Sequence, residues 1–384
     1  MNFDFATANR ILFGPGRAGE VGGLAAGLGR RALLVTGKDP RRAADVSADL
    51  AAHGLTVTTF AVSTEPTTDL VATGAALARD AECDLVVAVG GGSVLDAGKA
   101  IAALATNRAA ILTYLEVIGQ GQPLTHPALP IIALPTTAGT GAEVTRNAVL
   151  ASPAHGVKVS MRSASMLPAI ALVDPDLTRH LPPALTASTG MDALTQLLEA
   201  YVTPLANPIT DGLCREGLWR AANSLEQAFW DGEDPTARAD MAVASLFGGL
   251  ALANAKLGAV HGFAGVLGGM FDAPHGAICA ALLPPVMEVN VAALVDRTPI
   301  NPALRRYGEV ARILTGSREV TAKEGVARLR EMVTTFGIPG LGSHGVTQAD
   351  FPRIIAAAKP SSSMKGNPIL LSDEELALIL EQAL

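Results

Sequence analysis

Short apolar runs alternate with amphipathic stretches through the first half of the chain. The run RALLVT begins at Arg31 and the run DLVVAV begins at Asp84, and glycine follows each. Apolar runs of this length, followed by a turn, are typical of strands buried in a parallel sheet, because helices cover both faces of such a sheet. Their alternation with helical stretches predicts a doubly wound α/β domain. The predicted strands cover 31–36, 55–62, 84–89, 130–135 and 169–174, and the predicted helices between them include 43–53 and 67–80.

The strand pattern stops at the pair Pro182–Pro183. Beyond it, apolar residues recur at the spacing of helices that bury one face. We therefore expect two domains, an α/β domain over 1–180 and an all-helical domain over 181–384. The predicted helices of the second domain cover 184–201, 208–229, 235–256, 280–295, 303–314, 320–335, 349–358 and 373–382.

Composition narrows the class of protein. Of the 384 residues, 49% are hydrophobic and 17% are charged, which is typical of a folded enzyme. A net charge of −7 without a basic cluster argues against a nucleic-acid partner, and no apolar run reaches about eighteen residues, which argues against a membrane partner. The N-terminus lacks the pattern of a signal peptide, so we expect a cytoplasmic protein. The cysteines Cys83, Cys214 and Cys279 are too scattered to predict a disulfide framework or a thiolate metal site.

A glycine-rich turn follows the predicted strand at 84–89. The sequence GGGSVLDAGKA passes from Gly90 into a helix. Glycine lets the backbone approach a phosphate, and the first amides of the new helix point toward it. Gly91, Gly92 and Ser93 are therefore candidate contacts to a cofactor pyrophosphate, with Ser93 also a candidate N-cap. The alternative is a tight strand–helix turn that binds no ligand.

A second polar turn follows the predicted strand at 130–135. It reads TTAGTGAEVT, and its short hydroxyl side chains and two glycines suit hydrogen bonds to a pyrophosphate or ribose. Because both turns leave the carboxyl ends of strands, we expect them at one edge of the sheet. The candidate residues are Thr136, Thr137 and Thr140, with Lys158 further along as a candidate contact to a ribose or phosphate. A plain loop and a solvated basic residue are the alternatives.

Two histidines lie in an apolar, glycine-rich segment at 258–290. His261 and His275 are each followed by glycine. An imidazole in such surroundings needs a hydrogen-bond partner or serves as a metal ligand or acid–base group. Asp192 and Gln196 lie four residues apart in a predicted helix, which places both side chains on one face. These four residues are the candidate constellation, against the alternative of buried structural histidines and a helix-surface amide.

Four motifs resemble those of the iron-containing (group III) alcohol dehydrogenases. They are GGGSVLDAGKA from Gly90, ALPTTAGTGAEVTRNAV from Ala133, STGMDALTQLLEAY from Ser188 and the GAVHGF…APHGAICAALLP run from Gly258. They follow the family's order over almost the whole chain. The resemblance implies a Rossmann-like α/β domain and an all-helical domain, as in the dehydroquinate synthase-like architecture. It also implies a nicotinamide cofactor and a divalent metal, iron or zinc, in a cleft between the domains.

The resemblance assigns roles to single residues. Asp192, His261 and His275 match three metal ligands, and Gln196 stands where the family has a ligand histidine. An amide oxygen is a poorer ligand than an imidazole for iron or zinc, so the metal stays an open question. Without a metal, His275 or His261 must donate a proton or hydrogen bond to the developing alkoxide, with Asp192 orienting the imidazole. The residues that match the cofactor loops are Gly91, Gly92, Ser93, Thr136, Thr137, Thr140 and Lys158.

One position bears on the choice between NAD and NADP. Family members that prefer NAD often carry an acidic residue after the first strand's threonine, where it binds the ribose 2′-hydroxyl. Gly37 stands there, followed by Lys38, with Arg41 and Arg42 nearby. The loss of a carboxylate and the added cations relieve repulsion of a 2′-phosphate, so NADP is slightly favoured over NAD.

The predicted activity is reversible hydride transfer between NAD(P) and a small alcohol, aldehyde or ketone. One alternative is a metal-independent reductase similar to maleylacetate reductase, and another is a nucleotide-binding protein that has lost catalysis. The resemblance places Asn147 in the substrate pocket. Leu252 and Gly265, which replaces a further histidine of the family, indicate a roomier apolar pocket. Relatives are commonly dimers through the N-terminal strand region, so a homodimer through the segment 3–13 is expected.

Overall fold

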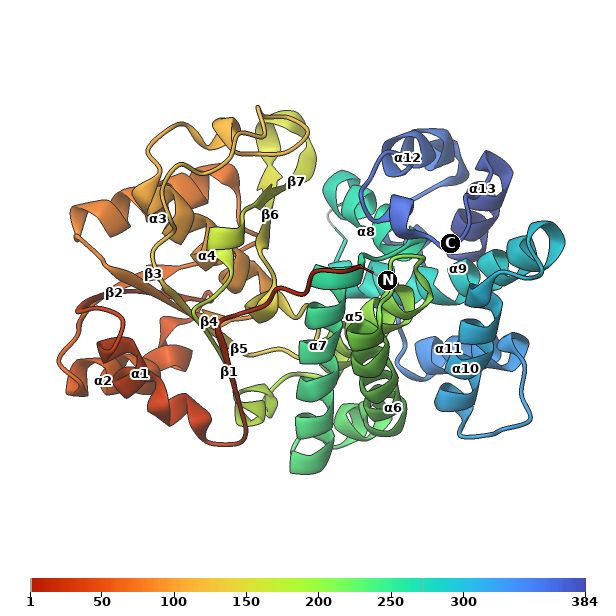
Figure 1. Cartoon of the computed structure of the whole chain (residues 1–384), viewed down its shortest axis with the longest axis horizontal. Coiled ribbons are helices and arrows are strands. Elements are labelled where there is room, and N and C mark those ends of the chain that lie inside the picture. Colours follow the sequence, from red (N-terminus) through yellow and green to blue (C-terminus); the bar gives the residue numbers. More distant parts are fainter. Residues whose placement is uncertain (1, 272) are drawn as a thin grey trace. The chain divides into compact units, whose positions relative to one another are not determined.

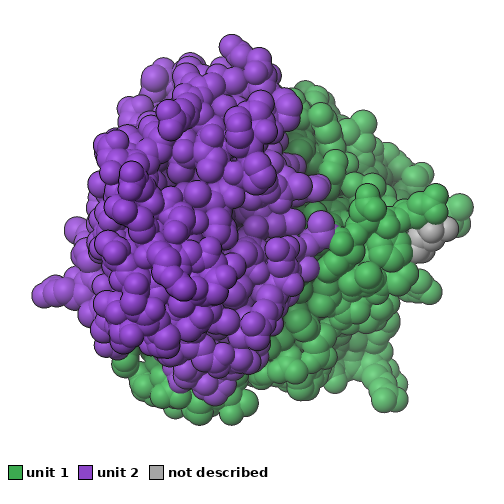
Figure 2. Space-filling view, turned by 60° about the vertical axis from the view of Figure 1, so that its left-hand side comes forward, with its two compact units in different colours: residues 1–5, 138–140, 179–384 green, residues 6–137, 141–178 purple. Residues whose placement is uncertain are grey.

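The computed structural model describes residues 2–271 and 273–384, which form two compact units (Figure 2). The sheet unit consists of residues 6–137 and 141–178, and the helical unit contains the other described residues. The main division at 178/179 lies beside the expected one at 180/181, but residues 2–5 and 138–140 belong with the helical unit. Close packing explains why residues 138–140 belong with the helical unit, because a Cβ on Gly139 would lie 2.8 Å from Thr189 Cβ.

The sheet unit is built on a six-stranded parallel sheet with the order β1–β8–β5–β4–β2–β3 (Figure 1). The predicted α/β class is confirmed, and each strand predicted from an apolar run is present. β1 forms one edge of the sheet and pairs with β8 along its length. The strands are β1 (Arg10–Phe13), β2 (Arg31–Thr36), β3 (Thr56–Ala61), β4 (Leu85–Gly90), β5 (Ile131–Pro135) and β8 (Ile170–Val173).

Alternate side chains of the central strands contribute to two apolar cores, one on each face of the sheet. Leu33 and Val86 pack in the core that contains α3 and α4, and Leu34 and Val87 pack in the core that contains α1 and α2. Burial on both faces is the reason that these strands read as continuous apolar runs. Figure 1 shows the two helix pairs on opposite sides of the sheet. The helices are α1 (Val21–Ala26), α2 (Ala44–Ala52), α3 (Thr68–Asp80) and α4 (Gly92–Thr106).

An antiparallel hairpin, β6 (Asn147–Ser152) and β7 (Val157–Arg162), stands apart from the main sheet. The sequence analysis did not predict it. Its strands alternate buried and more exposed side chains, as with Ala148 and Leu150 buried on β6, so neither strand forms a continuous apolar run. The alternation and the turn Pro153–Gly156 were the available signals.

The helical unit confirms the predicted helices and adds one, α8, which the sequence analysis missed. Gly262, Gly265 and Gly268 lower the helix propensity of that segment, and burial of Phe263 and Leu267 in the core stabilises the helix. The helices are α5 (Pro183–Val202), α6 (Pro208–Trp230), α7 (Pro235–Ala255), α8 (Ala259–Met270), α9 (His275–Arg297), α10 (Pro302–Thr315), α11 (Ala322–Thr335), α12 (Phe351–Ala358) and α13 (Asp373–Gln382).

Helix α9 is a core helix of this unit. By length and composition alone it could cross a membrane, and the pair α7 and α8 passes the same test only as a unit bent by 100°. However, 78% of the apolar window of α9 is buried inside the protein, which is typical of the central helix of a folded domain. Its first turns carry His275 and Cys279, beside α5 and α8.

Candidate functional site

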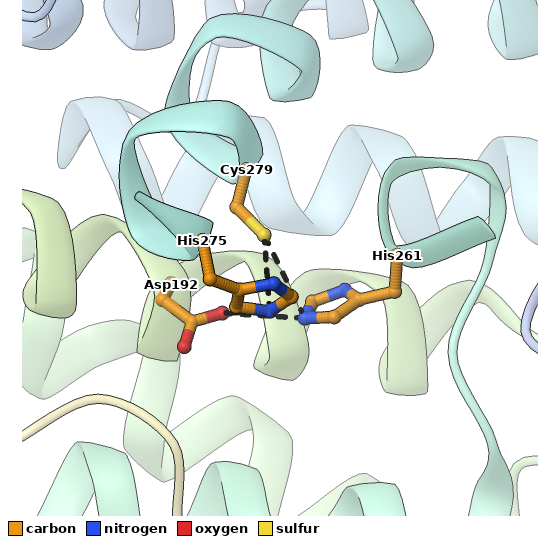
Figure 3. Close-up of side chains that lie close together, drawn as sticks. All are labelled: Asp192, His261, His275 and Cys279. Carbon is orange, nitrogen blue, oxygen red and sulfur yellow. Dashed lines mark hydrogen bonds and ion pairs between the residues drawn. The ribbon is translucent and has the colours of Figure 1, made fainter. Parts of the chain in front are cut away.

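Four side chains from three helices of the helical unit point toward one another (Figure 3). Asp192 comes from the middle of α5, His261 from the first turn of α8, and His275 and Cys279 from the start of α9. One ligand atom from each residue lies within 4.8 Å of the other three. The structure therefore brings together the ligand atoms of Asp192, His261 and His275, adds a thiol to them, and places the amide of Gln196 beside Asp192.

The carboxylate oxygen Asp192 Oδ1 faces both imidazoles. It is 3.2 Å from His261 Nε2 and 3.7 Å from His275 Nε2. Oxygen and nitrogen ligands at about 2.0–2.2 Å from a tetrahedral ion stand about 3.3–3.6 Å apart. The spacing of these three atoms therefore fits a divalent metal, and the donor set is one that zinc or iron accepts.

Glu199 orients the buried imidazole of His261. It lies on the same face of α5 as Asp192, and its Oε2 is 2.7 Å from His261 Nδ1. Its Oε1 also accepts a 2.7 Å hydrogen bond from the backbone N–H of Val260, at the start of α8. With Nδ1 donating to Glu199, Nε2 is the nitrogen directed at the cluster, and it can bind a metal once it has lost its proton.

Gln196 contacts the cluster through its amide nitrogen. Its Nε2 donates to Asp192 Oδ2 at 3.4 Å and to the carbonyl oxygen of Thr140 at 3.3 Å. Its Oε1 is buried, and within the described residues it has no hydrogen-bond partner. The opposite amide orientation would set this oxygen against two other oxygens, so the donor must face Asp192. In this geometry the amide holds the carboxylate and leaves Oδ1 for the cluster.

Burial and mutual charge shift the pKa values in the cluster. Cys279 raises the pKa of His275 to about 9 against the effect of burial, and Asp192 adds to the rise. Burial lowers the pKa of His261, but Cys279 and two carboxylates outweigh it and hold that pKa well above its usual value. Burial raises the pKa of Asp192, and the two histidines more than offset this, so the pKa is lowered. A divalent cation that binds here must displace the protons of the imidazoles and the thiol, because these groups bind metals only when deprotonated.

The sequence analysis missed two residues of this site, Glu199 and Cys279. Both follow a predicted site residue at helical spacing, Glu199 seven positions after Asp192 and Cys279 four positions after His275. The cysteines were expected to be too scattered for a metal site, whereas the structure places Cys279 beside Asp192, His261 and His275, which come from distant parts of the sequence. The spacing was a usable signal for Glu199, since 192, 196 and 199 share one helix face.

In the sheet unit, the glycine turn forms the start of α4. Gly91 is the N-cap residue, and in the described chain no side chain caps the helix, so Ser93 lies in the first turn and is not the cap. A Cβ on Gly91 would lie 3.3 Å from Thr137 Cγ2, which shows how closely the two predicted cofactor turns approach each other. The N–H of Thr136 also bonds the carbonyl oxygen of Gly90 at 3.0 Å. Adjacent backbone amides at an uncapped helix N-terminus suit a pyrophosphate.

Lys99 stabilises the second predicted cofactor turn through its buried ammonium group. Its ammonium group is 1% exposed and donates to the carbonyl oxygen of Ala142, the hydroxyl of Thr145 and the carbonyl oxygen of Asn147. It also pairs with Asp96, one turn earlier on α4, at 2.9 Å. A single buried cation therefore ties α4 to the loop that carries the threonines.

The remaining predicted residues lie in different surroundings. Lys158 on β7 forms an ion pair with Glu65, and Gly37 directly follows β2, with open space around its Cα. Asn147 begins β6 in the sheet unit, whereas Leu252 on α7 and Gly265 on α8 belong to the helical unit. A Cβ on Gly265 would meet no atom within 4 Å among the described residues. Thr140, expected with the sheet, belongs to the helical unit.

Comparison with known proteins identifies the family. Residues 8–175 match the family model of iron-containing alcohol dehydrogenases, and residues 186–384 match that of their C-terminal domain. The chain is 38% identical to a 1,3-propanediol dehydrogenase of Klebsiella pneumoniae over 99% of this chain and 98% of that protein. It is 36% identical to a 4-hydroxybutyrate dehydrogenase of Cupriavidus necator over 92% of each.

The fold agrees with a solved structure of the same group. The crystal structure of a 1,3-propanediol oxidoreductase matches with a TM-score of 0.92 and 36% identity over 100% of both chains. The matches span the sheet unit and the helical unit alike. The chain therefore belongs to the iron-containing alcohol dehydrogenase family and is an NAD(P)-dependent oxidoreductase of small alcohols and aldehydes.

Proposed function

We propose that this enzyme is a metal-dependent dehydrogenase of short primary alcohols, with 1,3-diols among its substrates and NADP as an accepted cofactor. One observation carries the proposal: Asp192 Oδ1 and the Nε2 atoms of His261 and His275 converge at ligand spacing in the helical unit. The substrate class is supported by relatives named for a three-carbon diol and a four-carbon hydroxy acid.

Oxidation moves a hydride from the carbinol carbon of the alcohol to the nicotinamide ring, and the hydroxyl proton is released to solvent. A divalent metal, when bound, supplies polarisation of the substrate oxygen. Asp192, His261 and His275 would hold this metal. Glu199 keeps the proton of His261 on Nδ1 and thus keeps Nε2 available. Gln196 fixes the second oxygen of Asp192.

The metal requirement is tested by chelation and reloading. Protein stripped of metal should lose most of its activity and regain it with zinc or iron, and elemental analysis should find about one ion per chain in the active form. His261→Asn should abolish both binding and recovery. Full activity in protein shown by elemental analysis to be metal-free would contradict the proposal.

The cofactor preference is supported by the surroundings of Gly37. The position carries no carboxylate, and Lys38, Arg41 and Arg42 are exposed nearby. Asp39, the nearest acid, is paired with Arg41 through two hydrogen bonds of 2.8 Å, which lower the pKa of its carboxyl to about 2. A 2′-phosphate at the end of β2 would therefore meet net positive charge.

This preference can be measured by comparing kcat/KM for NADPH and NADH. Gly37→Asp should shift the ratio toward NADH by about tenfold or more, since a carboxylate repels the 2′-phosphate and binds the 2′-hydroxyl. Gly37→Asn is the matched control, because it has the same size without the charge, and neither side chain meets an atom at its Cβ. A strong preference of the unaltered enzyme for NADH would refute this part of the proposal.

The substrate class calls for a panel of alcohols of matched size. We expect the highest kcat/KM for 1,3-propanediol and 1-propanol, and a lower value for 2-propanol, which differs only in the position of the hydroxyl. A preference for 2-propanol would contradict the assignment to primary alcohols.

A further inference from the structure

We infer that Cys279 is the fourth protein ligand of the metal, and that its thiolate takes the place which the side chain at position 196 does not fill. The inference rests on the proposed metal-dependent function and specifies its donor set as one carboxylate, two imidazoles and one thiolate. It also selects the class of metal, because a thiolate favours zinc and cobalt over magnesium and manganese.

The position of the sulfur is the first argument. Cys279 Sγ lies 3.6 Å from His275 Nε2 and 3.9 Å from His261 Nε2. A tetrahedral zinc with bonds of about 2.3 Å to sulfur and about 2.0–2.1 Å to nitrogen places these atoms about 3.6 Å apart. The sulfur–nitrogen distances therefore match the edges of a zinc tetrahedron as closely as the oxygen–nitrogen distances of 3.2 and 3.7 Å do.

The helix supplies the second argument. His275 and Cys279 are separated by one turn of α9, so their side chains leave the same face. Figure 3 shows both directed at the space between Asp192 and His261. Cys279 is fully buried, and its thiol points at the cluster and not at solvent. Binding of the ion would release the thiol proton, as metal binding by cysteine generally does.

The third argument is that Gln196 is turned away from this role. Its amide nitrogen faces Asp192 Oδ2 and the carbonyl oxygen of Thr140. Its Oε1 lies on the side of Gly248, where a Cβ would be 3.1 Å from it. This oxygen has no hydrogen-bond partner among the described residues, and the amide nitrogen, not the oxygen, is the atom directed at Asp192. Asp192, His261 and His275 therefore need a fourth donor from another element, and α9 provides it.

Cobalt substitution tests the inference, because a thiolate–cobalt bond has an intense charge-transfer band in the near ultraviolet that carboxylate and imidazole ligands lack. Full-length protein is stripped with a chelator and titrated with Co²⁺, with the bound metal counted by elemental analysis. We expect one Co²⁺ per chain and a band that saturates with it. Zn²⁺ should displace Co²⁺ and remove the band, whereas Mg²⁺ should not.

Two substitutions make the assignment specific. Cys279→Ser should remove the band and weaken metal binding by at least the 10–100-fold seen when outer-shell partners of a metal site are lost. Cys83→Ser is the matched control, since Cys83 lies in the sheet unit outside the cluster, and it should keep both the band and the affinity. Far-ultraviolet circular dichroism of each metal-free variant checks that it is folded, and Cys279→Ala provides a second variant with the same expected loss.

The outcomes separate this inference from the proposed function. Stoichiometric Co²⁺ binding without a thiolate band in the unaltered protein, or a band that persists in Cys279→Ser, would overturn the role of Cys279 and leave a metal held by Asp192, His261 and His275. If the unaltered protein bound no stoichiometric metal and was nevertheless active, the metal-dependent function and the role of Cys279 would both fail.

Discussion

The sheet unit and the helical unit build their sites from different parts of the chain. In the sheet unit, the turn at Gly91 and the helix start at Gly92 present backbone groups, and the residues involved follow one another in sequence. In the helical unit, side chains form the site, and two of them, His261 and Asp192, lie 69 positions apart in the sequence. The first kind of site depends on backbone conformation and space, whereas the second depends on how three helices pack.

Two buried carboxyl groups, one in each unit, have pKa values that are shifted in opposite directions. Glu143 in the sheet unit and Asp192 in the helical unit are each 2% exposed. Burial raises the pKa of Glu143 to about 7, although a backbone hydrogen bond and Lys99 lower it in part. The pKa of Asp192 is lowered, because the two histidines outweigh the effect of burial. Burial alone thus favours a neutral acid, and at Asp192 the neighbouring histidines outweigh burial and favour the charged carboxylate.

The largest effect is expected from removing the charge at the centre of the helical cluster. Asp192→Asn should lower kcat/KM about 1,000-fold or more, since polarisation of the substrate oxygen is worth several kcal/mol and each 1.4 kcal/mol is a factor of ten. Steady-state kinetics measure this loss of kcat/KM, and elemental analysis measures the metal content of the variant. Asp211→Asn, which removes a carboxylate paired with Arg306 outside the cluster, serves as the control. If both variants lost activity equally, the cluster would have no special role.

Glu143 should make the stability of the protein depend on pH. Its pKa is about 4.5 when unfolded and about 7 when folded, so the folded state binds the proton more tightly. Its stabilising contribution is complete below pH 4.5 and falls as the pH rises to about 7, by about 3 kcal/mol in total. The melting temperature of Glu143→Gln minus that of the unaltered protein should therefore increase as the pH rises from 5 to 8. A difference that does not change with pH would contradict the shift.

A glycine of the sheet unit should be sensitive to a single methyl group. A Cβ on Gly90 would lie 2.5 Å from Val94 Cβ, so Gly90→Ala should cost about 1–3 kcal/mol of stability and weaken NAD(P) binding. Urea unfolding and cofactor fluorescence titration measure the two effects. Gly23→Ala in α1, where the Cβ meets only ordinary contacts beyond 3.6 Å, should leave stability unchanged or raise it by up to about 1 kcal/mol.

The smallest effect is expected from a side chain in the glycine turn. Because backbone amides form that site, Ser93→Ala should raise the dissociation constant of the cofactor by no more than about tenfold, the value of one hydrogen bond. Fluorescence titration with the cofactor measures this dissociation constant. A loss comparable to that of Asp192→Asn would show that the sheet unit also depends on side-chain chemistry, and the contrast between the units would then be wrong.

The elements that the sequence predicted well were those with local signals. The strand of β4 and the glycine turn after it are encoded by adjacent residues, and the helix α5 by apolar spacing around Asp192. The hairpin of β6 and β7 and the helix α8 were missed. Cross-strand pairing stabilises the hairpin, and burial stabilises α8. Neither contribution can be recognised from a few adjacent residues of the sequence.

The sequence by itself determined the order of the strands of the main sheet and of the helices other than α8, the two turns predicted to bind the cofactor, and the candidate residues Asp192, His261 and His275. Only the tertiary structure decided that Cys279 joins them, that Glu199 orients His261 and that Gln196 turns its amide nitrogen toward Asp192. The physical reason is range: hydrogen-bonded turns and helix periodicity act over a few residues, whereas the meeting of side chains from α5, α8 and α9 depends on how their apolar faces pack.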